Sequence, residues 1–484
     1  MPDIPTLYQD YKKACALRSH WESTWQECYA YALPQRETVF QPSASKIPTL
    51  YDATAMDATD QLGALMLSEL TPPWLEWFHL TAGSQLSEEE KVKIAPVMNQ
   101  ISMALKNNLD RSNFASEIHQ CYLDLITLGT ACLLFEEAPV GSSSCFRFTA
   151  LPLNEVCLGE GPCGKLDKVF RCFTMDEATF IARYGLDKLP PQQNDKKQPL
   201  RLIEALIPRL KGGYDSYTFL HPDDQPLSAT KESPFLLKQA YYSTSPFVAF
   251  RWLKAPGEVY GRSPVMKALP DIKTANKVVE LILKNATISV TGIWLAEDDG
   301  VLNPATINLT PGAIIPKAVG SKGLTPLEAP GKFDVSQLVI KDLREHIRHA
   351  LLGDKLGTVC DNAKMTATEV LERSEEMIRI LGATYGRLQS ELLTPLINRA
   401  LALLRKRGEI PEIFLDGQIL TVSYKSPRAE IQARKQAQDA LSWLNAIKGL
   451  GENALTQLDT AKIMRWIGEK LALPADFIKE SVVP

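Results

Sequence analysis

The sequence lacks the features that would place it in a membrane or outside the cell. No stretch approaches the roughly 20 consecutive apolar residues that a membrane-spanning helix needs, and no secretory signal pattern opens the chain. The nine cysteines are an odd number, and Cys157, Cys163 and Cys172 lack the C-x-x-C spacing of zinc sites. We therefore expect no integral membrane segment, and thiols that stay reduced in a cytoplasm.

The chain also has no excess of basic charge. Its 53 Lys and Arg residues stand against 57 Asp and Glu residues, which gives a formal net charge of −4. This balance excludes a general attraction to nucleic acid, although a local basic strip can still form on a folded surface. Hydrophobic residues make up 45% and charged residues 23%, as in ordinary globular proteins. At 484 residues the chain should form several packed regions.

Motifs of common catalytic and metal sites are missing as well. The sequence contains no G-x-S-x-G and no H-E-x-x-H. Gly159–Leu166 approaches a phosphate-binding loop, but Leu166 stands where a Mg²⁺-binding hydroxyl is needed, and a β-like run follows where a helix is required. A hairpin turn explains this segment better. His346 and His349 could present two metal ligands, but no third is indicated. We predict no catalytic residues, no cofactor and no metal.

Helical and β-like patterns alternate along the first 250 residues. Apolar residues at helical spacing from Asp52 to Leu70, followed by two prolines, predict a helix. Short β-like runs separated by Pro, Gly, Asn and Asp extend from Cys132 to Trp252, with one helix predicted at Met175–Tyr184. The fold class is therefore predicted to be α+β and mainly helical.

Two predicted helices flank a turn-rich segment in the second half. Ser263 followed by Pro264 favours a helix start, because a serine hydroxyl caps free amides and proline suits the first turn. This helix should extend to about 287, with a break near Pro270. Residues 288–332 are too few for a core of their own. A second helix is predicted at 333–352, and a loop follows.

The start of a long helix is the clearest local signal. Thr366–Glu369 is a capping box, in which the threonine hydroxyl and the glutamate carboxylate each satisfy an amide of the first turn. Apolar residues keep helical spacing to about 407, and Pro395 should kink this helix near Glu391 because its ring displaces one backbone hydrogen bond. A strand is expected within 408–426 and helices within 427–484.

Three lysines fall on one stripe of the predicted helix that ends near 287. Lys273, Lys277 and Lys284 share this stripe, and Glu280 interrupts it. Taken alone, the pattern is typical of a solvated face with a Glu–Lys pair. In a symmetric ring, each lysine would become a ring of lysines that can contact phosphates without reading bases. Both interpretations stay open.

Seven short motifs occur in a fixed order along the chain. They are Tyr51–Ala55, Ser68–Pro73, Trp77–Phe78, Arg251–Trp252, Gly257–Pro264, Asp271–Lys273 and Thr366–Val370. In content and order, this set resembles the head-to-tail connecting proteins, or portal proteins, of short-tailed bacteriophages. The motif residues to which we assign a structural role are Tyr260, Gly261, Arg262, Pro264, Thr366 and Glu369.

The resemblance implies a subunit that forms a dodecameric ring with copies of itself at one capsid vertex. Double-stranded DNA would be packaged, retained and ejected through the ring without sequence-specific contacts. The further partners would be the terminase large subunit, tail adaptor proteins, and the major capsid and scaffolding proteins, with no membrane involved. The subunit would reside in the virion, and in the host cytoplasm during assembly.

The resemblance also divides the chain into regions. These are a wing at 1–250, a first stem helix at 263–287 with a break near 270, a clip at 288–332, a second stem helix at 333–352, a tunnel loop at 353–365, a long kinked wing helix at 366–407, wing strands at 408–426 and a helical crown at 427–484. Candidate DNA-channel contacts are Lys273, Lys277, Lys284, Lys355 and Lys364. The alternatives are a monomeric or low-order virion adaptor or internal protein, and an enzyme of phage DNA metabolism.

Overall fold

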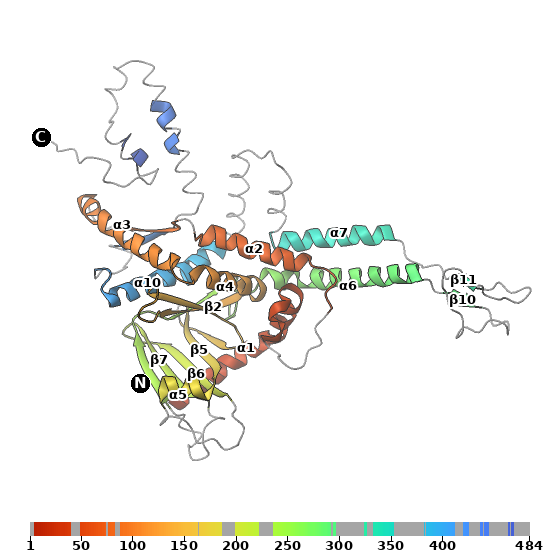
Figure 1. The fold of residues 1–484 in the computed structure, drawn as a ribbon, viewed down its shortest axis with the longest axis horizontal. Coiled ribbons are helices and arrows are strands. Elements are labelled where there is room, and N and C mark those ends of the chain that lie inside the picture. The colour runs from red at the N-terminus through yellow and green to blue at the C-terminus, as the bar shows by residue number, and fades with distance from the viewer. Residues whose placement is uncertain are drawn as a thin grey trace, which may run out of the picture. The chain divides into compact units, whose positions relative to one another are not determined.

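The described part of the chain mixes helices with antiparallel sheets (Figure 1). The computed structural model describes residues 4–39, 49–73, 76–82, 88–162, 164–185, 199–221, 236–291, 294–296, 324–326, 333–352, 382, 384–411, 420–424, 436–438, 440–444, 463–464 and 466–468. Unit 1 of the fold comprises Met1–Trp21, Gly63–Arg262 and Asn362–Pro484, and unit 2 comprises Glu22–Leu62 and Ser263–Asp361. The predicted loop at 353–365, the capping box at Thr366–Glu369 and most of 427–484 lie outside the described residues.

A five-stranded antiparallel meander forms the larger sheet of unit 1. Its strands are β4 (Val156–Glu160), β5 (Leu166–Met175), β6 (Leu200–Pro208), β7 (Tyr214–Leu220) and β8 (Leu236–Tyr242), each paired with the next. Alternate residues of β6 point to opposite faces, as the pleat requires. Ile203 and Ala205 join a core with Leu7 and Ala14 of helix α1 (Ile4–Ala32). Leu202 joins a second core formed with Phe180 of α5 (Glu177–Tyr184).

A smaller sheet in the same unit has the order β3–β2–β9. These strands span Phe146–Leu151, Thr130–Glu137 and Phe247–Arg251, and helix α4 (Phe114–Leu128) leads directly into β2. Gly129 ends α4 with φ +80°, a left-handed conformation that favours glycine. Phe135 and Phe148 stack across the strand pair, with ring centroids 4.3 Å apart. The Trp252 amide, just after β9, donates to the Gly129 carbonyl oxygen at 2.9 Å, which holds the end of α4 beside the end of β9.

Among the remaining elements of unit 1 are several that the sequence pattern predicted. Helix α2 (Thr54–Leu70), which begins in unit 2, lies within the predicted range, and α3 (Glu88–Asp110) follows β1 (Phe78–Ala82). Strand β12 (Leu420–Tyr424) falls where a strand was expected, and pairs antiparallel with β1. At the predicted kink near Glu391, the helix changes to a π-helical turn, η4 (Gln389–Leu393), before α10 (Thr394–Arg407). Pro395 explains the change, because it cannot donate the next helical hydrogen bond.

Unit 2 contains a helical hairpin. Helices α6 (Pro264–Thr291) and α7 (Phe333–Ala350) pack against each other and lead to a short antiparallel ribbon of β10 (Trp294–Ala296) and β11 (Leu324–Pro326) (Figure 1). The ribbon lies within the predicted turn-rich segment.

The predicted break near Pro270 is wrong, since α6 continues through this proline and past 287. Val265 and Ala268 before the proline, and Ile272 and Ala275 after it, are all buried. Their packing offsets the loss of one backbone hydrogen bond, so tertiary contacts override the local preference.

Candidate nucleic-acid interface on a helical hairpin

Two of the predicted channel lysines lie exposed on α6 and share one carboxylate. Lys277 Nζ lies 2.8 Å from Glu280 Oε2, and Lys284 Nζ lies 2.5 Å from Glu280 Oε1. The hydrogen bonds from Lys277 and Lys284 lower the pKa of Glu280, so the carboxylate stays ionised at neutral pH. The lysine side chains are 62% and 64% exposed. The group therefore carries one net positive charge and presents both ammonium groups to solvent.

The third lysine of the stripe has a different environment. Lys273 Nζ lies 2.5 Å from Glu27 Oε2 and 5.9 Å from the ring centroid of Tyr31, both on α1. The exposed fraction of its side chain is 38%. Lys273 therefore connects α1 to α6 within unit 2, which makes it a weaker candidate for contact with a ligand. Lys355 and Lys364 lie outside the described residues.

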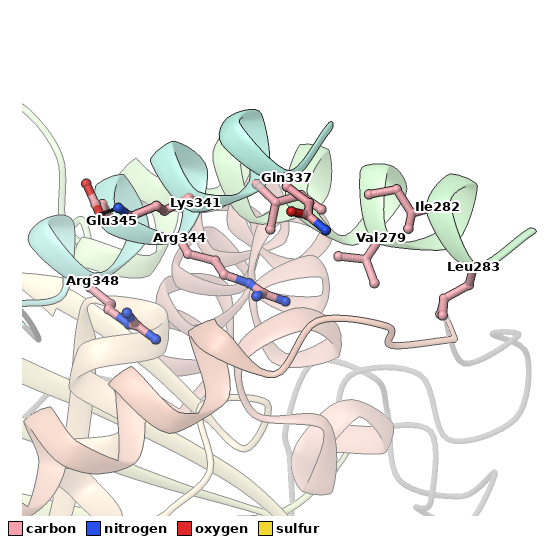
Figure 2. Close-up of a pocket in the computed structure, with 9 residues that line it drawn as sticks. Val279, Ile282, Leu283, Gln337, Lys341, Arg344, Glu345 and Arg348 are labelled. Carbon is pink, nitrogen blue, oxygen red and sulfur yellow. Dashed lines mark ion pairs between the residues drawn. The ribbon is translucent and has the colours of Figure 1, made fainter. Parts of the chain in front are cut away.

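A groove of about 550 Å³ runs between α6 and α7 (Figure 2). Val279, Ile282 and Leu283 line it from α6, and Gln337, Ile340, Lys341, Arg344, Glu345 and Arg348 line it from α7. The α6 wall is thus apolar, while the α7 wall carries three basic residues and one acidic residue. The hairpin exposes further large apolar side chains, namely Leu281 on α6 and Leu338 and Val339 on α7. Such a concentration of apolar surface is typical of a contact site rather than a solvated face.

The α7 wall of the groove is tied to the start of α2. Arg344 Nε and Asp52 Oδ2 are 2.8 Å apart, while Asp52 Oδ1 accepts a hydrogen bond from the Thr54 amide. Burial raises the pKa of the Asp52 carboxyl, but the hydrogen bonds from Thr54 and Arg344 outweigh burial and leave the pKa below its usual value. Asn276 of α6 also accepts a hydrogen bond from the Tyr51 amide at 2.6 Å. The motif Tyr51–Ala55 therefore anchors the hairpin inside unit 2.

A second group of motif residues is buried in unit 1 around Arg251. This side chain is fully buried, and its Nη2 lies 2.7 Å from Glu391 Oε1 in the π-helical turn. Its guanidinium also donates to the carbonyl oxygens of Val259 and Gly164, each at 3.0 Å. Gly164 belongs to Gly159–Leu166, the segment that contains the turn of the β4–β5 hairpin. The hairpin prediction is confirmed, and this turn binds an arginine of the same chain.

Tyr260 and Gly261 fix the packing of the same motif. Tyr260 is fully buried, and its hydroxyl accepts a hydrogen bond from the Leu158 amide at 3.1 Å. Burial raises the pKa of this hydroxyl, so it stays protonated. The Gly261 amide donates to Thr130 Oγ1 at 2.8 Å. A Cβ at Gly261 would stand 2.1 Å from the Gly129 carbonyl oxygen, so only glycine fits there. Both residues are structural.

Arg262 and Pro264 end the motif at the start of α6. Arg262 is 60% exposed, and its guanidinium makes a two-pronged ion pair with Glu258, at 2.6 and 3.0 Å. Ser263 Oγ accepts a hydrogen bond from the Met266 amide at 2.8 Å, and Pro264 is the first helical residue. The predicted serine cap is therefore confirmed. Thr366 and Glu369 lie outside the described residues.

Neither a metal centre nor a membrane-crossing helix occurs in the described residues. In this part of the chain, no group of three or more His, Cys, Asp and Glu residues could hold a metal ion. Among the helices that the structure describes, none combines the length and apolar character that crossing a lipid bilayer requires.

Residues 5–478 match the model of the family described as bacteriophage head to tail connecting protein. The chain belongs to this family. The Probable portal protein of Bordetella phage BPP-1 is 25% identical over 95% of the chain and 86% of its own length. The Portal protein of Salmonella phage epsilon15 is 24% identical over 86% of this chain and 77% of its own length. The Portal protein of Escherichia phage T7 is 21% identical over 82% of this chain and 74% of its own length.

Solved structures of particle necks are also similar to this head to tail connecting protein. The neck of an empty GTA particle, computed with C6 symmetry, matches with a TM-score of 0.37 and 12% identity, over 87% of this chain and 90% of that chain. The neck of a native GTA particle, computed with C12 symmetry, matches with a TM-score of 0.36 and 11% identity, over 87% of this chain and 92% of that chain.

The described residues that the sequence singled out thus separate into two kinds. The buried residues Arg251, Tyr260 and Gly261 hold unit 1 together, whereas Lys277 and Lys284 are accessible on unit 2. Sequence reasoning missed the pairing of Arg251 with Glu391, although both positions carried a signal, one as a motif residue and the other as a predicted kink. It also missed the groove between α6 and α7, because that groove depends on how two distant helices pack.

Proposed function

We propose that this head to tail connecting protein is a portal subunit. Copies of it form a ring at one capsid vertex, through which double-stranded DNA is packaged, retained and later ejected. The observation that carries the proposal is the family match over residues 5–478, together with relatives named portal proteins that match over most of the chain. The role is structural and needs neither a cofactor nor a metal.

The helical hairpin supports the assembly of copies into a ring. Its groove and the exposed side chains of Leu281, Leu338 and Val339 offer apolar surface on both helices. Contacts between unlike faces of identical subunits generate a ring when the rotation closes. A neighbouring copy would bury this surface, and its removal from water would stabilise the ring. We propose a dodecamer.

We assign the regions of the portal subunit accordingly. Helices α6 and α7 are the two stem helices, and the β10–β11 ribbon belongs to the clip. Residues 353–365 form the tunnel loop. The wing comprises 1–250, the helix at 366–407 and the strand region at 408–426, and residues 427–484 form the crown.

Lys277 and Lys284 are the DNA contacts that these observations support best. Repeated around the ring, they would form two bands of positive charge, each moderated by Glu280. Lysines contact phosphates without reading bases, and a partly neutralised band lets DNA slide, because fewer counterions are released when DNA binds. Lys355 and Lys364 would add phosphate contacts from the tunnel loop, whereas Lys273 is held by Glu27.

The remaining partners follow from this position in the particle. We propose that the ring docks the terminase large subunit during packaging and tail adaptor proteins afterwards, and that it assembles with the major capsid and scaffolding proteins. Assembly would take place in the host cytoplasm, and the finished ring would reside at the portal vertex of the virion.

Native mass spectrometry of the purified full-length chain tests the ring. A single large oligomer is expected. A monomer or dimer as the stable species at high concentration would contradict the proposal and favour a low-order virion adaptor. Leu338→Asp should lower the fraction of rings, because Leu338 is 65% exposed on α7 and its replacement leaves the core intact. Leu210→Asp is the matched control, because Leu210 is exposed as well but lies between β6 and β7.

A further inference from the structure

Two cysteine sulfurs in unit 1 lie closer than ordinary contact. Cys15 Sγ on α1 and Cys157 Sγ on β4 are 2.8 Å apart, although the residues are separated by 142 positions in the chain. None of the seven described cysteines forms a disulfide. We propose that Cys15 and Cys157 form a disulfide when the protein meets a peroxide, and that this bond fastens α1 to the five-stranded sheet.

The geometry of the pair requires little rearrangement. A disulfide bond is about 2.04 Å long, so the two sulfurs need to approach by about 0.8 Å. Side-chain rotation can supply this distance, since the two sulfurs already face each other. The surrounding elements are in place as well, because Leu7 and Ala14 of α1 pack against the same sheet face that carries Cys157. The bond would therefore lock an existing contact.

Access to solvent sets the order of the chemical steps. Cys157 is fully buried, whereas Cys15 is partly exposed. The hydrogen bond with Cys15 and burial both raise the pKa of the Cys157 thiol, so it reacts poorly with a dissolved oxidant. Cys15 is thus the sulfur that a peroxide reaches first.

The reaction then balances in two steps. Hydrogen peroxide oxidises the Cys15 thiol to a sulfenic acid and leaves as water. The Cys157 sulfur attacks the Cys15 sulfur, the S–O bond breaks, and the departing hydroxide takes the Cys157 proton to form a second water. One peroxide therefore consumes two thiols and yields one disulfide and two waters. A dithiol reductant reverses the result by exchange.

A third thiol nearby provides a matched control. Cys172 lies on β5 at the edge of the same core, and it shares hydrogen bonding with Tyr11, which also contacts Cys15. Burial raises the pKa of the Cys172 thiol too. The sulfurs of Cys15 and Cys157 are in direct contact, so replacing Cys172 should leave their cross-link unchanged.

A biological consequence rests on the proposed portal function. A portal ring assembles in a reducing cytoplasm, where thiols persist, whereas a released particle meets an oxidising medium. The bond would then form after release and would restrain α1 only in the mature particle.

The test uses the full chain treated with hydrogen peroxide, followed by non-reducing peptide mapping. A linked pair of peptides containing Cys15 and Cys157 is expected, lighter by two hydrogen atoms and separated again by dithiothreitol. The thermal midpoint should rise by several degrees in the wild type and in Cys172→Ser, but not in Cys15→Ser. A Cys15–Cys172 link, or sulfinic acid at Cys15 without any link, would overturn the inference. Because the peptide map is made on wild-type protein, misfolding of a variant does not affect it.

A second measurement separates the chemistry from the proposed function. Particles and infected-cell extracts are collected into an alkylating reagent and mapped in the same way. The link is expected in released particles and absent from extracts. If peroxide forms the link in purified protein but particles contain only alkylated thiols, the proposal that the bond forms after release is wrong. Native mass spectrometry tests the ring separately, so a failure of either proposal can be told from a failure of the other.

Discussion

Glu391 inside unit 1 and Glu280 on the surface of unit 2 are carboxylates that each bind two cations. Glu391 pairs with Arg251 and Arg387, at 2.7 and 3.2 Å. Glu280 pairs with two lysines at 2.8 and 2.5 Å. The distances are alike, but the Arg251 side chain is 0% exposed and both lysines are more than half exposed. Burial therefore decides what each cluster contributes.

The buried cluster contributes to folding, and the exposed one leaves its charge accessible to solvent. Removing one member of a buried pair leaves a charge without solvent or counter-charge, which costs about 3–5 kcal/mol. An exposed pair contributes only about 0–1 kcal/mol, because water screens it. Exposure therefore distinguishes a residue that stabilises the fold, such as Arg251, from residues whose charge stays accessible to solvent, such as Lys277 and Lys284.

Replacing Arg251 should have the largest effect. Arg251→Ala should lower the stability around β9 by about 3–5 kcal/mol, because it removes the nearer of the two cations that pair with Glu391 and leaves the carbonyl oxygens of Val259 and Gly164 without this donor. Hydrogen exchange of the β9 amides measures this local free energy. Arg262→Ala removes an exposed ion pair from a neighbouring family motif and should cost less than about 1 kcal/mol. Equal losses of stability in Arg251→Ala and Arg262→Ala would show that burial does not determine the cost of losing the ion pair.

Asp52 provides an intermediate case between the two clusters. Its side chain is almost fully buried, whereas its partner Arg344 is half exposed. Asp52→Asn should destabilise the start of α2 by about 1–2 kcal/mol, because the ion pair and part of the hydrogen bonding to Thr54 are removed. Hydrogen exchange of the α2 amides gives this value.

The same carboxyl predicts a pH dependence with a defined sign. The folded-state pKa of Asp52 lies below its unfolded value, so its contribution is fully present above the unfolded pKa, about 3.9. That contribution is lost as the pH falls through the lower, folded-state pKa. The wild type and Asp52→Asn should therefore differ in α2 protection at neutral pH and converge in acid. A constant difference across this range would exclude the ionised carboxylate as the cause.

Local chemistry explains which features were predictable. The Ser263 cap, the turn at Gly159–Leu166 and the helix at 333–352 depend on neighbouring residues, and the structure agrees with each. The partner of Lys284 was predictable for the same reason, since Glu280 precedes it by one helical turn.

Features that depend on distant residues were not predictable. Glu391 lies 140 positions from Arg251, and Glu27 lies 246 positions from Lys273, so no local pattern connects either pair. The continuation of α6 through Pro270 also depends on tertiary contacts. Buried side chains before and after the proline stabilise a helix that the local sequence preference would interrupt. Composition and spacing likewise could not reveal the groove between α6 and α7.

Replacing the exposed lysines should have the smallest effect on stability and a clear effect on DNA. Lys277→Ala combined with Lys284→Ala should leave the stability of α6 almost unchanged, because both ion pairs are exposed and water screens them. Assembled rings of this variant should bind DNA more weakly, with a salt dependence whose slope falls by roughly one for each phosphate that is no longer neutralised. Glu280→Gln is the opposing control, since it removes the neutralising carboxylate and should strengthen DNA binding. If both variants shift DNA affinity in the same direction, or neither does, the lysine stripe is only a solvated face of α6.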